Sequence, residues 1–121
     1  MATARGNKYH AVTTTERQEQ RAIVDLLRSV GGQVWVIGTT RKRGDHPGAM
    51  QTPGLADIFA VVPAKGDLFD TAVWIEVKAA GGRMRPAQVE FQRCCKAACI
   101  GHLVGGVDVV LDWLKRGGWI K

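Results

Sequence analysis

The sequence contains no apolar run approaching the ~20 residues that a membrane-spanning helix needs, which excludes such a transmembrane segment. Residues 1–15 also lack the apolar stretch of a secretory signal. Prolines are few, with four in 121 residues. The hydrophobic content of 45% is too high for a disordered protein. We therefore expect one folded domain at residues 15–121, preceded by a flexible polar arm at residues 1–14.

Cysteine is also scarce, with three residues crowded into six positions: Cys94, Cys95 and Cys99. An odd number of cysteines packed this closely on a predicted helix makes no sensible disulfide framework, so the sequence favours a reducing cytoplasm. We expect buried core thiols on an apolar stripe of that helix. The members of this stripe are Phe91, Cys94, Cys95 and Ala98.

The charge is unbalanced towards positive, because 17 Lys and Arg stand against 11 Asp and Glu, a net charge of +6. A basic domain of this size commonly meets nucleic acid, although solubility alone explains such a charge equally well. The four tryptophans do not interleave with basic residues as a platform for single strands would, and we expect most of them in the core. They are Trp35, Trp74, Trp113 and Trp119.

Hydrophobic periodicity and turn residues predict seven elements. A capping box at residues 15–18 begins the first helix, and a proline opens the second. The expected elements are a helix after Thr15 that Gly31 ends, strands Gln33–Ile37, Leu55–Val62 and Thr71–Ala79, a helix Pro86–Cys99, a strand His102–Val104 and a helix Asp108–Arg116. This α-β-β-β-α-β-α order predicts an α/β fold with a mixed sheet, whose second and third strands form an antiparallel hairpin.

Three charged residues interrupt strands that are otherwise apolar: Asp57, Glu76 and Lys78. Alternation places Glu76 and Lys78 on one face, and pairing of the two strands would bring Asp57 beside Glu76. Two carboxylates in a half-dry site repel each other, and a divalent cation such as Mg²⁺ resolves the repulsion. Alternatively, Glu76 and Lys78 lie on a solvated edge face and Asp57 belongs to a turn.

The order of Gly54-Leu55-Ala56-Asp57 and then Glu76-Val77-Lys78, with a helix before and another after, resembles the PD-(D/E)XK nuclease superfamily. More narrowly it resembles the VRR-NUC family, over residues 16–105. The resemblance implies a restriction-endonuclease-like core and a protein of a bacterium, or of a phage in the cytoplasm of its host.

The resemblance also implies roles for individual residues. Asp57 matches the metal-binding acid of the family, with Ala56 in place of the usual proline, and Glu76 matches the second ligand of Mg²⁺ or Mn²⁺. Lys78 matches the catalytic lysine, and the backbone carbonyl of Val77 would be a third ligand. Gln88 resembles the glutamine that begins the following helix and would help to position the nucleophile.

These nucleases often carry a further acid on the first helix, and three positions remain open for it. The family register falls nearest Gln20, whereas the helical wheel favours Glu19 and Glu16. For Glu16, a favourable interaction with the helix dipole explains the residue equally well. We take Glu19 as the expected additional metal ligand.

The expected function is a metal-dependent endodeoxyribonuclease that acts on branched or duplex DNA. The alternative is a catalytically inactive DNA-binding or scaffolding protein with the same fold. The expected phosphate contacts are Arg41, Lys42 and Arg43 in a long loop, Gly38–Pro53, and Arg83 and Arg85 near the site.

Small relatives resemble dimeric resolvases of four-way (Holliday) junctions, so we expect a homodimer. Apolar residues near the C-terminus offer a candidate interface, although core packing explains them equally well. They are Trp113, Leu114, Trp119 and Ile120.

Overall fold

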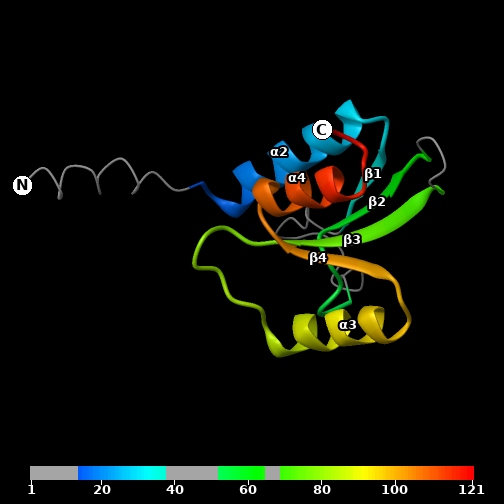
Figure 1. The fold of residues 1–121 in the computed structure, drawn as a ribbon. Coiled ribbons are helices and arrows are strands. Elements are labelled where there is room, and N and C mark those ends of the chain that lie inside the picture. Colours follow the sequence, from blue (N-terminus) through cyan, green and yellow to red (C-terminus); the bar gives the residue numbers. More distant parts are fainter. Residues whose placement is uncertain (1–13, 38–51, 65–68) are drawn as a thin grey trace, which may run out of the picture.

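The helices and strands follow one another in the order that the sequence predicts (Figure 1). The structure is a computed structural model that describes residues 14–37, 52–64 and 69–121. Its elements are α2 (Glu16–Ser29), β1 (Gln33–Val36), β2 (Ile58–Val62), β3 (Thr71–Val77), α3 (Pro86–Ala97), β4 (Gly101–Gly105) and α4 (Val107–Arg116). Residues 1–13 of the expected arm and 38–51 of the expected long loop lie outside the described residues.

The four strands form one mixed sheet in the order β1-β2-β3-β4. β2 and β3 pair antiparallel, with Ile58 opposite Ile75, which confirms the predicted hairpin. β3 and β4 pair parallel, with Glu76 opposite Val104, because α3 lies between them in the chain and provides the crossover. The expected α/β architecture with a mixed sheet is therefore confirmed.

Helices α2 and α4 lie side by side over one face of the sheet (Figure 1). Alternate strand residues point to this face and form the core with the apolar stripes of the two helices. Each large side chain that leaves water completely contributes about 1.5–3 kcal/mol of hydrophobic free energy. Fully buried members of this core include Ile23, Leu27, Ile58, Ile75, Val110 and Leu114.

The capping box predicted at the start of α2 is present. Thr15 Oγ1 accepts the N–H of Gln18 at 3.1 Å, and Gln18 Oε1 accepts the N–H of Thr15 at 2.8 Å. Two amides that the first helical turn cannot satisfy are thereby paired. In the part of the chain that the structure describes, no helix is both long and apolar enough to cross a membrane.

The opposite face of the sheet is covered only in part, because α3 packs mainly on the edge strand β4 (Figure 1). In α3 only Cys95 is buried, while Phe91 is half-buried against Trp74. Cys94, Ala98 and Cys99 are exposed, so the expected buried stripe is wrong for Cys94 and Ala98, and the expected burial of the thiol is wrong for Cys99. A helix that packs on the edge of a sheet directs only a narrow row of side chains towards the sheet. The other side chains of the helix are exposed to water.

The largest differences from the predicted strands lie at the open end of the β2–β3 hairpin, while β1 is one residue shorter than predicted and β4 is one residue longer at each end. β2 begins at Ile58 instead of Leu55, and β3 ends at Val77 instead of Ala79. The carboxylate of Asp57 accepts the N–H of Val77 at 2.9 Å, so a side chain replaces the next hydrogen bond between the strands. The aspartate thus ends the pairing of β2 with β3, whereas the pairing of β3 with β4 continues to Val77.

The C-terminal aromatic residues belong mainly to the core. Leu114 is fully buried and Trp119 is 7% exposed, so the expectation that they offer a spare apolar surface is wrong. Trp119 stacks on Trp113 with a centroid distance of 4.9 Å, and its indole N–H donates to the carbonyl of Pro63 at 2.9 Å. Half-buried Trp113 and Ile120 pack against the same core.

Gly54 lies where the chain before β2 touches the start of α3. Its φ is +88°, and a Cβ at this position would overlap the backbone carbonyl of Ala87. Only glycine combines this left-handed conformation with so close an approach. The contact brings the segment that ends in Asp57 against the helix that carries Gln88.

We predict that Gly54→Ala destabilises the protein by about 2–4 kcal/mol, the sum of left-handed strain and overpacking. Gly81→Ala is the matched control, because Gly81 has a φ of +82° and its added methyl group would meet no described side chain or backbone within 4 Å beyond its chain neighbours. Its cost should be only the strain, about 1–2 kcal/mol. Urea unfolding measures both values, and equal losses would show that the contact with Ala87 relaxes freely.

Candidate active site

Asp57 and Glu76 meet at the open end of the β2–β3 hairpin. Ile58 pairs with Ile75, so the register carried one residue further sets Asp57 opposite Glu76, as the sequence predicts. The hydrogen bond from the N–H of Val77 holds the Asp57 carboxylate at the end of the ladder. The structure therefore brings together two acids that are far apart in the sequence.

Glu76 is the buried member of the pair, with only 2% of its surface exposed. Burial raises the pKa of this carboxyl to about 7, the negative charge of Asp57 acts in the same direction, and Lys78 opposes both. A carboxyl group whose pKa lies near neutral pH gains or loses its proton with little cost. Glu76 can therefore release its proton when another positive charge binds to the pair.

Lys78 and Gln88 both approach the same oxygen of Glu76. Lys78 Nζ lies 3.6 Å from Glu76 Oε2, and its side chain is 12% exposed. Gln88 Nε2 donates to that oxygen at 2.9 Å. The structure thus gathers the four residues that the sequence proposed as catalytic: Asp57, Glu76, Lys78 and Gln88.

The start of α3 fixes the orientation of Gln88. The side-chain oxygen Oε1 accepts the N–H of Arg85 at 2.7 Å, immediately before the helix begins. With its oxygen held there, the amide directs its NH₂ group to Glu76. Because Gly54 lets the preceding chain approach Ala87, the turn before β2 and this helix end support one another.

The donor set suits a hard divalent cation. Mg²⁺ typically takes one or two carboxylates and completes its shell with water and phosphate oxygens. Asp57 and Glu76 provide such a pair. Within residues 14–37, 52–64 and 69–121, no group of three or more His, Cys, Asp or Glu side chains is arranged to hold a metal ion. The contribution of the Val77 carbonyl stays a prediction.

Glu19, the expected additional ligand, serves a different partner. Its Oε1 accepts the N–H of Val107 at 2.7 Å, and the Thr14 hydroxyl donates to its other oxygen. Both hydrogen bonds lower the pKa of this carboxyl. The cap of α4 is Gly106, which has no side chain, and a Cβ there would overlap Glu19. Glu19 therefore caps α4, and the structure does not place it with Asp57 and Glu76.

This capping contact has no signal in the sequence, because its two residues are separated by 88 positions. The other two positions considered for the acid also lie on α2. Glu16 is exposed and Gln20 is half-buried on α2.

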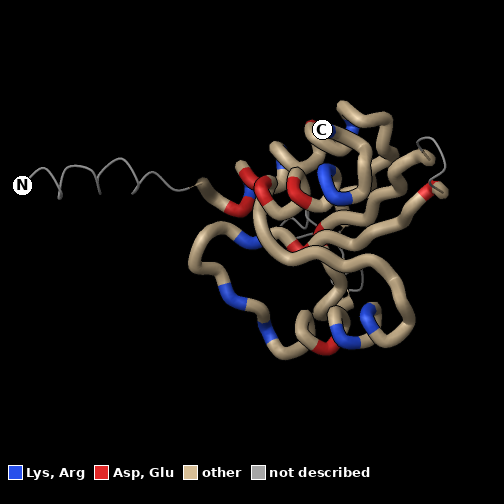
Figure 2. The backbone as a smooth tube through the Cα atoms, viewed as in Figure 1, with Lys and Arg blue, Asp and Glu red and all other residues tan. Residues whose placement is uncertain are grey.

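Lys78 also lines a groove of about 680 Å³ at the ends of β3 and β4. The groove continues along the segment after β3 and the beginning of α4, and Glu19 lies on its wall. Figure 2 shows Lys and Arg residues, and no acid, along the segment from Lys78 to the start of α3. Arg83 and Arg85 there are exposed, whereas Arg41, Lys42 and Arg43 lie outside the described residues.

The fold is shared with a domain of known structure. A solved structure named "VRR_NUC domain" matches with a TM-score of 0.61 and 16% sequence identity, covering 87% of this chain and 99% of that one. At this identity the likeness concerns the fold, and it confirms the fold that the family resemblance implied. No protein-family model matches the chain, and no curated protein matches it either.

The raised pKa of Glu76 predicts how stability depends on pH in metal-free buffer. The folded protein keeps this proton up to about pH 7, whereas an unfolded glutamate loses it near 4.5. The stabilising contribution is therefore complete below pH 4.5 and is lost as the pH rises through 7. We expect the free energy of unfolding of the wild type to decline over this window, and Glu76→Gln to remove that decline.

Urea unfolding at a series of pH values measures the effect. Glu90→Gln is the control, because Glu90 is an exposed carboxylate paired with Arg93 on α3, and its pKa is lowered. That variant should keep the wild-type decline. Parallel profiles for the wild type and Glu76→Gln would contradict the assignment of the proton to Glu76.

Proposed function

We propose that the protein is a metal-dependent DNA endonuclease of the VRR-NUC type. The observation that carries the proposal is the pair of half-buried Asp57 and buried Glu76, with Lys78 and Gln88 on one oxygen of the glutamate. The pair lies in a chain whose fold matches a VRR_NUC domain. The two findings are independent, because one concerns side chains and the other concerns the path of the backbone.

Asp57 and Glu76 would hold Mg²⁺ or Mn²⁺. When bound, such an ion polarises a phosphodiester and lowers the pKa of a coordinated water. The remaining work falls to the protein. Gln88 fixes the rotamer of Glu76, and Lys78 orients the attacking water or stabilises the negative charge that develops on the phosphate.

Phosphate binding follows from the charges around the pair. Arg83 and Arg85 are exposed beside Lys78 on a segment free of acids, and they would contact the backbone on either side of the cleaved bond. The phosphate contacts predicted from the sequence for Arg41, Lys42 and Arg43 fall outside the described residues. The substrate would therefore be a polyanion, and DNA is the one that the fold favours.

The alternative is a protein of this fold that binds DNA without cutting it. Burying a charged glutamate beside a second acid costs stability, and a binding protein would gain nothing from that cost. The retained pair therefore favours catalysis.

The first test combines cleavage with metal binding. Asp57→Asn and Glu76→Gln keep the size of each side chain, and both should abolish cleavage of DNA in Mg²⁺ or Mn²⁺. Manganese should raise the melting temperature of the wild type by mass action and that of the two variants little. Lys78→Ala should lose about 100-fold or more in rate while it keeps the stabilisation by manganese.

Glu19→Ala serves as the control, since Glu19 caps α4 in the structure. It should lower the free energy of unfolding by about 1 kcal/mol and still cut DNA. Inactivity of the wild type with every metal and substrate, together with intact DNA binding, would favour the non-cleaving alternative. A loss of manganese stabilisation in Glu19→Ala would return this residue to the ligand set.

We further propose that two copies act together on branched DNA such as a four-way junction. The described residues build one acidic pair, and one such site cuts one strand. A symmetric dimer supplies a second site at a fixed distance without a longer chain.

Light scattering should therefore give twice the chain mass of 13.1 kDa. A four-way junction should be nicked on opposing strands, and faster than a linear duplex of the same sequence. A strictly monomeric enzyme that shows no preference for the junction would contradict the dimer and leave the nuclease proposal in place.

A further inference from the structure

A row of aromatic side chains crosses all four strands on the face that α3 covers only in part. Trp35 of β1 is opposite Phe59 of β2, Phe59 is opposite Trp74 of β3, and Trp74 is opposite His102 of β4. Residues paired in this way point to the same face of a sheet. We call these four side chains the aromatic row.

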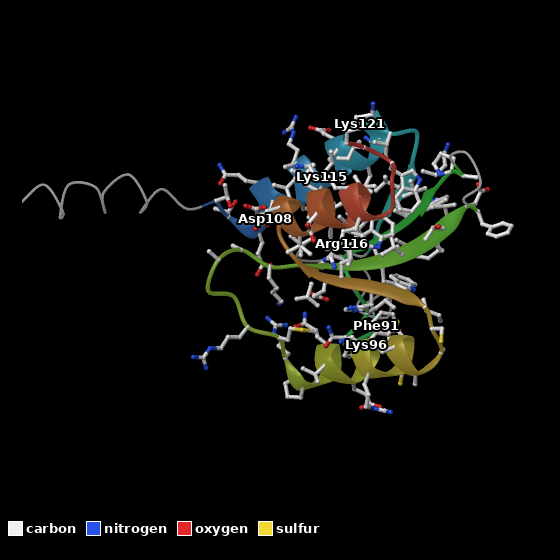
Figure 3. The ribbon with its side chains drawn as sticks, in the orientation of Figure 1. Phe91, Lys96, Asp108, Lys115, Arg116 and Lys121 are labelled. Atoms are coloured by element: carbon white, nitrogen blue, oxygen red, sulfur yellow. The ribbon has the colours of Figure 1, made fainter. Side chains whose placement is uncertain are left out.

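The rings of Trp35, Phe59 and Trp74 contact one another in turn, and Phe91 of α3 bridges Trp74 and His102. The ring centroids of Trp35 and Phe59 are 5.8 Å apart, and those of Phe59 and Trp74 are 4.8 Å apart. Phe91 of α3 packs edge-on against Trp74 at 5.3 Å and against His102 at 5.7 Å. Figure 3 shows Phe91 directed from α3 towards the sheet. One end of the row is thus closed by the helix.

The other end of the row is open to water. Trp35 is 49% exposed, and Phe59 beside it is half-buried. The sequence expectation that most tryptophans lie in the core is therefore wrong for Trp35. Its strand is at the edge of the sheet, and α3 packs at the opposite edge, on β4. A large indole held by a neighbouring ring yet facing solvent is a preformed stacking surface.

The row lies next to the acidic pair on the same strands. Glu76 follows Trp74 by two residues, so both point to the same face, and Phe59 stands in the same relation to Asp57. Two residues of a strand span about 7 Å, a distance that the sugar and base of a single nucleotide can bridge. A strand whose phosphate lies at the acidic pair would therefore place a neighbouring base over the row.

The charges beside the row favour a nucleic acid over an apolar partner. The segment after Lys78 carries Arg83 and Arg85, and Lys96 of α3 is close enough to His102 for its charge to add to the effect of burial in lowering the pKa of the imidazole. Aromatic rings on a sheet flanked by basic residues suit a base stacked above its phosphates. A partner bound through apolar contacts alone would not need these charges.

We propose that Trp35 and Phe59 bind an unpaired nucleobase by stacking, and that this contact directs the enzyme to DNA with unpaired nucleotides beside the cleaved bond. A paired base has no free face to offer, because its neighbours in the duplex already stack on it. The proposal rests on the proposed nuclease function for its location, but binding tests it without any cleavage.

The experiment measures affinity in EDTA with the full chain. The probes are a fluorescein-labelled oligothymidylate and a blunt hairpin duplex. Trp35→Ala should weaken binding to the oligothymidylate about tenfold, because stacking of one base contributes that order of affinity. Binding to the duplex should not change. Trp35→Phe, which keeps an aromatic face, should restore most of the affinity.

Two controls separate stacking from other effects. Phe69→Ala removes an aromatic side chain that is 86% exposed and lies outside the row, and it should bind both probes like the wild type. An oligonucleotide with abasic sites keeps its phosphates but has no bases to stack. The wild type should bind the abasic probe as weakly as Trp35→Ala binds the oligothymidylate. The affinity of Trp35→Ala should be no lower for the abasic probe than for the oligothymidylate. The salt dependence should remain the same for both proteins.

The results that would overturn the proposal are distinct from failure of the nuclease function. Equal losses for oligothymidylate and duplex, or no loss at all in Trp35→Ala, would exclude a stacking role. A dimeric wild type that becomes monomeric in Trp35→Ala would show that a second copy covers this face. If the protein cleaves no DNA with any metal, but Trp35→Ala still weakens binding to the oligothymidylate and not to the duplex, only the nuclease function is refuted.

Discussion

The placement of two carboxylates at the end of one hairpin is the constraint on which the rest of the site depends. Asp57 ends the pairing of β2 with β3 by taking the N–H of Val77, and Glu76 lies buried beside it. Removing a glutamate from water next to another acid is unfavourable, which is why its pKa rises to about 7. Lys78 and Gln88, which both approach the glutamate, moderate this cost.

The surrounding elements are arranged to hold Glu76 in place. Gln88 donates to it from the first turn of α3, and that amide is itself fixed by the N–H of Arg85. Gly54 allows the chain before β2 to touch the same helix end. Because these contacts join the hairpin and the chain before it to the start of α3, the complete site needs both elements in place.

The two faces of the sheet have different roles. The face under α2 and α4 is filled with aliphatic side chains and supplies the hydrophobic stability. The other face carries Glu76, the aromatic row and, on β1 and β2, a surface that α3 leaves open. Glu19 joins the two helices of the first face by capping α4, so an acid on the first helix can stabilise the fold without binding a metal.

The sequence by itself determined the order of the elements, the hairpin, and the convergence of Asp57, Glu76 and Lys78, whereas the place of Gln88 came from the family resemblance. Local patterns carry that information, since alternation assigns faces and a proline or capping box marks a helix start. The tertiary structure alone decided where α3 lies, and hence that Cys94 and Cys99 are exposed and Trp35 faces water. It also decided that Glu19 pairs with Val107, because contacts between residues far apart in the chain depend on how elements pack and leave no periodic trace in the sequence.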